Sequence, residues 1–368
     1  MGNERIDVTE DFEYDSENEQ YNQDYRHWRR HTREPFVFHF SDNSREHIYV
    51  EGAPPVSMDA ALAERQALMH CSTMLGAALL IFLLSEVLGS SVLIAAMKMM
   101  HVPISINFLD FKMGGSQWAV TGVRSLCLIL KFGLPTLILT KMCKLPQPVF
   151  APASLGAIPE MIAAVGAGMM IAAVYSTAAI GTSVQTSQRL FAYKDIAAIG
   201  TYGVFDTLAV SVLAELFFRG ALLPLLRQFG DPFSVIVTAL IGFLCPNELP
   251  ERICELLIGL AAGYLLIRSG SIIKCAALRI VYSALKYARL GLVYASEEIR
   301  LWQYIIILLG IGTVLILFFV HFRRTKLMLQ NRKTFLPMKK KLYYLTQSVP
   351  MLPWLAASLL LMLLNLLQ

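Results

Sequence analysis

Charged residues are scarce in this chain. Asp, Glu, Lys and Arg make up only 16% of its 368 residues, whereas 55% are hydrophobic and the mean hydropathy is +0.53. An ordinary soluble domain carries more charge and fewer apolar residues. Several apolar runs approach or exceed 18 residues, the length at which a helix becomes a candidate to cross a bilayer. We therefore expect an integral, multi-pass membrane protein and not a soluble α/β protein with unusually apolar helices.

The long central region of the chain lacks histidine, and the cysteines are not arranged in pairs. The chain has seven His, and none of them lies between His101 and His321. A metal site or a cysteine nucleophile in that long central region would have to work without an imidazole ligand or base. The six Cys lie within or beside apolar runs and form no CxxC pair. We expect them to be small buried hydrophobic residues, and neither disulfides nor zinc ligands.

The few charges are unevenly distributed. Residues 1–66 hold 15 acidic and 7 basic side chains, whereas basic residues predominate in the rest of the chain. Basic residues beside membrane spans follow the positive-inside rule and do not indicate a nucleic-acid partner. No signal peptide is visible before the first apolar run, so we expect the acidic tail to be cytoplasmic. Residues 1–33 show no apolar periodicity and are expected to be disordered or adaptable.

The apolar runs predict an all-α polytopic membrane bundle of about 8–9 transmembrane helices. Their approximate limits are 68–98, 117–140, 159–182, 197–226, 233–250, 252–267, 271–290, 303–322 and 350–368. The last run is barely long enough to span and is alternatively an interfacial helix. Glu251 and Arg252 are expected in an outside turn. The predicted division is a partly disordered tail 1–66, N-terminal helices 67–196, a core 197–290, and C-terminal helices 291–368 with a basic cytoplasmic loop 323–341.

The core carries polar residues at depths where lipid would not tolerate them without a partner or a site. Gly230, Asp231 and Pro232 predict a break between the fourth and fifth spans. Glu215 and Asn247 each lie 16 residues from Asp231. In an antiparallel helix pair both would reach about 24 Å from the turn.

Two further pairs have helical spacing. Glu215 and Arg219 are four residues apart, as are Arg279 and Ser283, which follow a second predicted break at 269–271. These four residues and Asn247 could therefore meet in one polar pocket, with Glu215–Arg219 as a buried pair. Outside the core, Glu86 and Arg124 have similar expected depth and are predicted to pair, while Lys131 is expected to snorkel or to face a pocket.

The spacing of these motifs resembles that of the CPBP family of intramembrane proteases, which includes the CAAX proteases and the Abi proteins. That family has a Glu-Glu-x-x-x-Arg motif, then Phe-x-x-x-His on the next helix, then His-x-x-x-Asn two spans later. The corresponding stretches here are AELFFRG, FLCPN and RIVYS, the last preceded by GLAAGYLLIRSGS. The resemblance covers roughly 70 to 90 residues and implies a helical membrane fold with a hydrolytic metal centre.

This chain departs from the family motifs at the residues that the family uses for catalysis. Ala214 stands where the family has the Glu that activates water, Asn247 and Arg279 stand in place of the two His, and Ser283 in place of the Asn. A hydrolytic metal needs about three good ligands and an open position. Glu215 and Asn247 are weak candidate ligands, and Arg279 brings a positive charge that cannot be removed by deprotonation. No catalytic residue or cofactor is therefore expected.

Three functions remain open at this point. The first is a diverged, non-catalytic family member that binds an apolar or prenylated peptide, or a partner membrane protein, in the former cleft. The second is an active metallopeptidase of the CAAX-processing type with atypical ligands, which would require zinc. The third is a small transporter or structural membrane subunit. The pocket positions to examine are Ala214, Glu215, Arg219, Asn247, Arg279 and Ser283.

Overall fold

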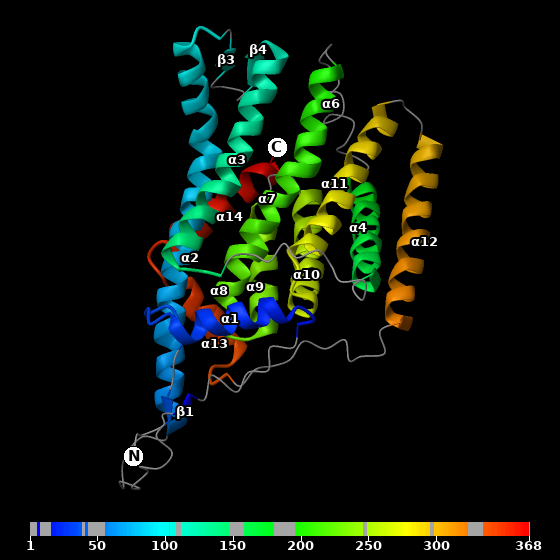
Figure 1. Ribbon diagram of the computed structural model, residues 1–368. Coiled ribbons are helices and arrows are strands. Elements are labelled where there is room, and N and C mark those ends of the chain that lie inside the picture. The colour runs from blue at the N-terminus through cyan, green and yellow to red at the C-terminus, as the bar shows by residue number, and fades with distance from the viewer. Residues whose placement is uncertain are drawn as a thin grey trace.

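The described part of the chain is a bundle of helices (Figure 1). The structure, a computed structural model, describes residues 6–7, 16–38, 41–42, 56–102, 104–107, 112–146, 158–179, 196–245, 249–294, 298–322 and 334–367. Its strands are short antiparallel pairs, β1 (Ile6–Asp7) with β2 (Ser41–Asp42) and β3 (Ile104–Asn107) with β4 (Lys112–Gly115). The predicted all-α class is confirmed.

The helices follow the predicted apolar runs closely. Before the core they are α1 (Glu19–His31), α2 (Val56–Met99), α3 (Gln117–Met142) and α4 (Ile158–Ala178). One continuous rod then comprises α6 (Ile196–Phe205), η2 (Asp206–Val210), α7 (Ser211–Glu215), η3 (Leu216–Leu222) and α8 (Leu223–Arg227). After it come α9 (Asp231–Leu244), α10 (Leu249–Ser269), α11 (Ile272–Tyr294), α12 (Glu298–Phe322), α13 (Met338–Thr346) and α14 (Met351–Leu367).

The number of membrane spans is lower than predicted. Five described helices are long and apolar enough to cross a membrane, or six if the bent pair α13 and α14 forms one span. The core helices α9, α10 and α11 are too short or too polar to pass the same test of length and hydropathy. The helix α9 has only 14 residues, and α10 and α11 carry several ionisable side chains. The long apolar helices make the chain an integral membrane protein.

Part of the segment 1–33, which the sequence predicts to be disordered or adaptable, forms the helix α1 (Glu19–His31). It crosses one end of the bundle at a steep angle to the other helices, and we call this the α1 end (Figure 1). Tyr25 and Trp28 are buried, the Tyr25 hydroxyl donates to the Pro224 carbonyl at 2.9 Å, and Trp28 Nε1 donates to the Cys143 carbonyl at 3.0 Å. The sequence does not reveal this because α1 packs through aromatic residues and arginine stems and has no aliphatic stripe.

The segment that follows α1 is anchored by one amide. Gln228 is fully buried; its Oε1 accepts from the Phe38 backbone N–H at 2.8 Å, and its Nε2 donates to the Phe36 carbonyl at 2.9 Å. Buried backbone polar groups need such partners. The tail residues 36–38 are therefore part of the folded core at the α1 end.

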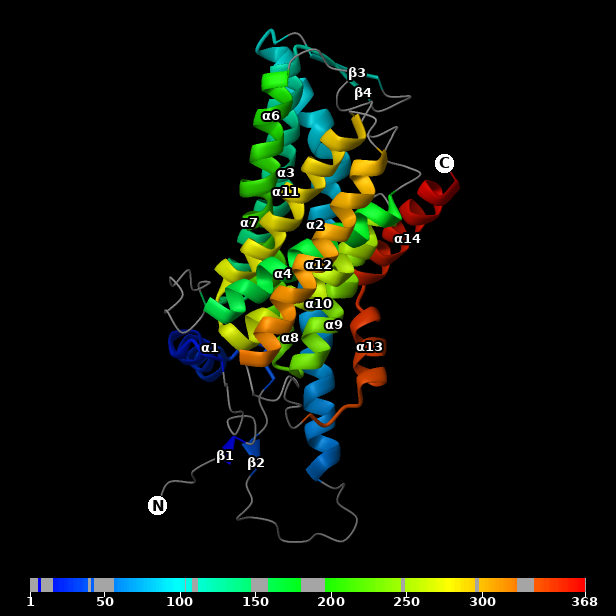
Figure 2. The ribbon, with the colours of Figure 1, turned by 90° about the vertical axis from the view of Figure 1, so that its right-hand side faces the viewer.

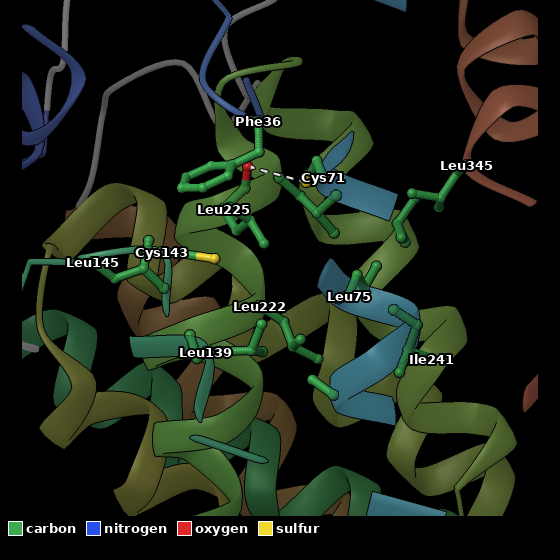
Figure 3. Packing of buried hydrophobic residues seen from close by; sticks show 14 of the residues in the cluster. Phe36, Cys71, Leu75, Leu139, Cys143, Leu145, Leu222, Leu225, Ile241 and Leu345 are labelled. Carbon is green, nitrogen blue, oxygen red and sulfur yellow. Dashed lines mark hydrogen bonds between the residues drawn. The ribbon is translucent and has the colours of Figure 1, made fainter. Parts of the chain in front are cut away.

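A hydrophobic cluster joins this end of the bundle to the core helices (Figure 3). Cys71 and Leu75 of α2 pack with Leu222 and Leu225 of the rod, and the Cys71 thiol lies 3.9 Å from the Leu225 carbonyl. Viewed from the side, α13 and α14 lie along the opposite edge of the bundle from α1 (Figure 2). The cluster therefore fixes α2 against the helix that carries the predicted site.

Candidate functional site

Two glycine turns set the register of the core helices. Gly230 has φ of +117° between α8 and α9, and Gly270 has φ of +62° between α10 and α11, a backbone region that favours glycine. Both predicted breaks are confirmed. At a third glycine, Gly259, an added Cβ would lie 2.5 Å from the Ala239 Cα, so α9 and α10 can touch only because Gly259 has no side chain. The polar residues of α10 are thereby held against the core.

The centre of the site is a buried ion network. Arg279 Nε lies 2.6 Å from Glu215 Oε1, and its other two guanidinium nitrogens donate to both oxygens of Glu255 at 2.5 and 2.8 Å. On the far side of the same Glu215 carboxylate, Arg219 Nε lies 3.3 Å from Glu215 Oε2. Glu215 is 0% exposed. A bidentate arginine–carboxylate contact of this kind is among the strongest polar contacts in proteins.

The helix that carries Glu215 departs from α geometry on both sides of it. The segment α7 is flanked by the π-helical stretches η2 and η3, and Arg219 lies within η3. Arg219 also donates through Nη2 to the Ile258 carbonyl of α10 at 3.1 Å. Such π-helical turns are rare and are found frequently at functional sites. Here they turn a short α-helical segment so that Ala214 faces a cavity while Glu215 points to the arginines.

A cavity of about 320 Å³ lies beside this network. Of the six predicted positions, Ala214, Arg279 and Ser283 line it. Glu215 and Arg219 form the buried layer behind Arg279, and Asn247 lies outside the described residues. One wall is aromatic, formed by Phe82, Phe132 and Phe218. Charged side chains line the cavity as well, and Lys131 Nζ lies over the Phe82 ring, 4.8 Å from its centroid, so apolar and charged groups are in contact in the lining.

Glu255 is the site residue that the sequence reasoning missed. Glu251, one turn earlier on α10, also lines the cavity and accepts from Lys286 Nζ at 3.0 Å. A usable signal existed, because two acids four residues apart on a mostly apolar helix share one face. The expectation that Glu251 and Arg252 lie in an outside turn is wrong. The helix α10 begins at Leu249, which places both residues in its first turn.

The predicted partner of Glu86 is also wrong. Lys131 Nζ lies 2.8 Å from Glu86 Oε1, and both residues line the cavity. Lys131 therefore faces a pocket, which was one of its two predicted orientations. Arg124 and Lys131 are seven residues apart on α3, so they lie on the same face about 10 Å apart along the axis. The error therefore lies in the depth counted along the two helices.

The residues present do not fit a hydrolytic zinc ion. Glu215, the one matched carboxylate, has each oxygen facing an arginine, at 2.6 and 3.3 Å, so a cation would meet two fixed positive charges. Within the described ranges, no group of three or more His, Cys, Asp and Glu side chains is arranged to hold a metal ion. No hydrolytic step through a metal follows from this geometry.

Comparison with known proteins gives one match. Residues 198–285 match the family model described as type II CAAX prenyl endopeptidase Rce1-like. None of the curated proteins and none of the solved structures matches the chain. The matched segment contains nearly all of the rod, α9, α10 and most of α11, and it carries the arginine–carboxylate network. The match over residues 198–285 confirms the resemblance inferred from the motifs and is consistent with a member of the CPBP/CAAX protease family.

Proposed function

We propose that this protein is a diverged, non-catalytic member of the CAAX-protease-like family that binds an apolar peptide segment in the former catalytic cleft. One observation carries the proposal: Arg279 bridges Glu215 and Glu255 in the family's His position. A buried bridged ion pair is costly to open, because each separated charge would remain in a medium of low dielectric. The pair therefore holds the helices together and leaves the catalytic positions closed to water activation.

The cavity supports a binding role. Its volume of about 320 Å³ lies at the lower end of the range for small-ligand sites. The aromatic rings of Phe82, Phe132 and Phe218 suit aliphatic side chains or a prenyl group, and Ser211 and Tyr282, which also line the cavity, can bond to a peptide backbone. The proposal keeps the α1 end on the cytoplasmic side, as the basic residues predict. A partner membrane protein could present the same kind of segment.

Two measurements test the proposal. An N-acetylated apolar hexapeptide amide should bind the purified full-length protein, and Ser283→Phe, which fills the cavity, should weaken that binding at least about tenfold. Ala284→Phe is the control, because Ala284 neighbours Ser283 but is exposed. Equal binding by both variants would contradict the proposal.

The second measurement addresses the alternative of an active metallopeptidase. Purified protein should contain no stoichiometric Zn²⁺ or Co²⁺ by elemental analysis. One bound metal per chain that is lost in Glu215→Ala would overturn the non-catalytic interpretation and favour hydrolysis with atypical ligands.

A further inference from the structure

A groove with basic side chains lies where α1 meets the end of α3. It measures about 480 Å³, and it is lined by α1, by residues that follow α1 and by residues that follow α3. Its lining includes His27, His31, Arg33 and Lys144. No described residue lines both this groove and the cavity beside Arg279, so the two sites are separate.

The chain around this groove is strongly basic. Residues 24–34 and 141–146 contain six Lys and Arg and two acids, Asp24 and Glu34, and five of the six basic residues are at least partly exposed. Glu34 accepts from Lys144 Nζ at 3.1 Å, an exposed pair of the kind that contributes little to stability. Attraction to the negative end of a helix explains basic residues in a last turn, but Arg33 and Lys144 lie beyond the last turns of α1 and α3. The groove therefore presents positive charge that a ligand can neutralise.

The groove lies at the depth of lipid headgroups. The helix α3 is one of the candidate membrane spans, Gln117–Met142, and Lys144 follows its end by two residues. Trp28 Nε1 donates to the Cys143 carbonyl at 3.0 Å, which holds α1 across the end of that span (Figure 1). Tryptophan is enriched at the boundary between membrane and water. Clusters of Lys and Arg beside the cytoplasmic end of a span are typical of sites for anionic lipids.

We propose that this groove binds the phosphorylated polyol headgroup of an anionic lipid, of the phosphoinositide class, in the cytoplasmic leaflet. A phosphomonoester carries about −1.5 to −2 charges at pH 7, which suits the cations of Arg33 and Lys144. The imidazoles of His27 and His31 are exposed and offer N–H donors to phosphate oxygens. Asp24, the one acid among the described lining residues, can accept from the hydroxyl groups of a polyol. The groove has the volume of a small-ligand site and accommodates a ring with its phosphate, whereas a serine headgroup would fill only part of it.

A lipid in this groove would contact α1 and the segment after α3 together. Because it binds only the state in which α1 is docked, it should raise the stability of that state, more so at higher lipid concentration. This consequence is independent of any peptide in the cavity, so the inference goes beyond the proposed function.

The experiment compares two lipids that differ by one phosphate. Dioctanoyl phosphatidylinositol monophosphate and dioctanoyl phosphatidylinositol are titrated calorimetrically into full-length protein in non-ionic detergent. The phosphorylated lipid should bind at least about tenfold more tightly, since hydrogen bonds to charged groups exceed neutral ones. Arg33→Gln and Lys144→Gln should each weaken its binding about fivefold, the contribution of one basic residue near a membrane surface. The double variant should bind both lipids alike.

The matched control removes two exposed cations elsewhere. Lys339→Gln with Lys340→Gln lies on α13, along the opposite edge of the bundle from α1, and should change binding by less than about twofold (Figure 2). Since Arg33 and Lys144 are exposed, their double variant should unfold at the same temperature as the unmodified protein when no lipid is present, which separates loss of binding from misfolding.

Three outcomes would overturn the proposal. Equal binding of the two lipids to the unmodified protein would show that the phosphate is not recognised. Equal weakening by the two double variants would show a general effect of charge and no site in the groove. Free inositol bisphosphate, which has the headgroup without acyl chains, should bind at least about tenfold more weakly. If it binds as tightly as the phosphorylated lipid, the ligand is a soluble phosphate and not a lipid.

Discussion

Arg279 Nε lies 2.6 Å from Glu215 Oε1, and this contact joins α11 to the rod that runs from α6 to α8. Glu255 completes the bridge from α10. Three of the core helices therefore meet at one guanidinium group. Arg279, which stands where the quoted family motif has His, therefore ties these helices together.

Removing the bridge should destabilise the protein strongly. Arg279→Ala leaves Glu215 and Glu255 buried without that cation, and loss of one partner of a buried pair costs about 3–5 kcal/mol. The midpoint of thermal unfolding in detergent should fall clearly. Lys339→Ala removes an exposed cation and is the control. An unchanged midpoint in Arg279→Ala would rule out the bridge as a structural element.

The bidentate contact should also be measurable as a coupling energy. A double-mutant cycle of Glu255→Gln and Arg279→Gln should give non-additive changes in the free energy of unfolding, on the order of 1–3 kcal/mol for side chains in direct contact. The pair Glu255→Gln and Lys339→Ala, which is not in contact, should be additive. Additivity in the first cycle would mean that Arg279 and Glu255 do not stabilise each other.

The close approach of α9 and α10 predicts a steric effect at Gly259. An added Cβ would lie 2.5 Å from the Ala239 Cα, so Gly259→Ala should cost about 1–3 kcal/mol through overpacking. Gly291→Ala on α11 is the control, because no atom lies within 4 Å of its added Cβ. That control should be neutral or stabilising by up to about 1 kcal/mol, since alanine is the better helix former. Equal effects of the two substitutions would contradict the packing.

The docking of α1 can be followed through Cys143. Burial raises the pKa of the Cys143 thiol to about 12, and the negative charge of Glu34 adds to the effect. The ordinary value is 9.0, so between pH 9 and pH 12 the unfolded state loses its proton first and the stabilising contribution is lost as pH rises. At pH 8 maleimide should label Cys143 slowly in the folded protein.

Loosening α1 should expose that thiol. Trp28→Ala removes a buried ring and the hydrogen bond from Nε1 to the Cys143 carbonyl. Labelling of Cys143, read by peptide mass spectrometry, should then accelerate. His27→Ala, on the exposed face of α1, should leave the rate unchanged. Rapid labelling in the unmodified protein would show that α1 does not cover Cys143.

The sequence predicts the helices of the core well, because apolar runs and glycine turns are local signals. The run 197–226 corresponds to the rod Ile196–Arg227, and the break at Gly230 is where it was expected. The partners within the site are predicted less well. Glu215–Arg219 follows from helical spacing, but Glu255 was missed because its contact depends on how α10 and α11 rotate against each other. Helix length gives depth and does not give the facing side.

The folding of the N-terminal segment into helix α1 could not be predicted, for a different reason. The helix α1 has no aliphatic stripe, its buried face is formed by Tyr21, Tyr25 and Trp28, and its stability comes from partners far along the chain, such as Pro224 and Cys143. Segments with few aliphatic residues are usually disordered when alone. Here a tertiary surface supplies the contacts that the segment itself lacks.

The shared guanidinium of Arg279 also constrains how this chain could change over generations. Replacing it by His alone would leave the Glu255 carboxylate without a guanidinium and would weaken the core before any activity arose. Ala214→Glu alone would bring another carboxylate to a cavity whose lining already includes Glu251 and Glu255. Each single step toward a hydrolase would therefore lower fitness through stability, and only concerted substitutions would avoid the loss. Under the proposed non-catalytic function, the bridge would make catalysis hard to regain.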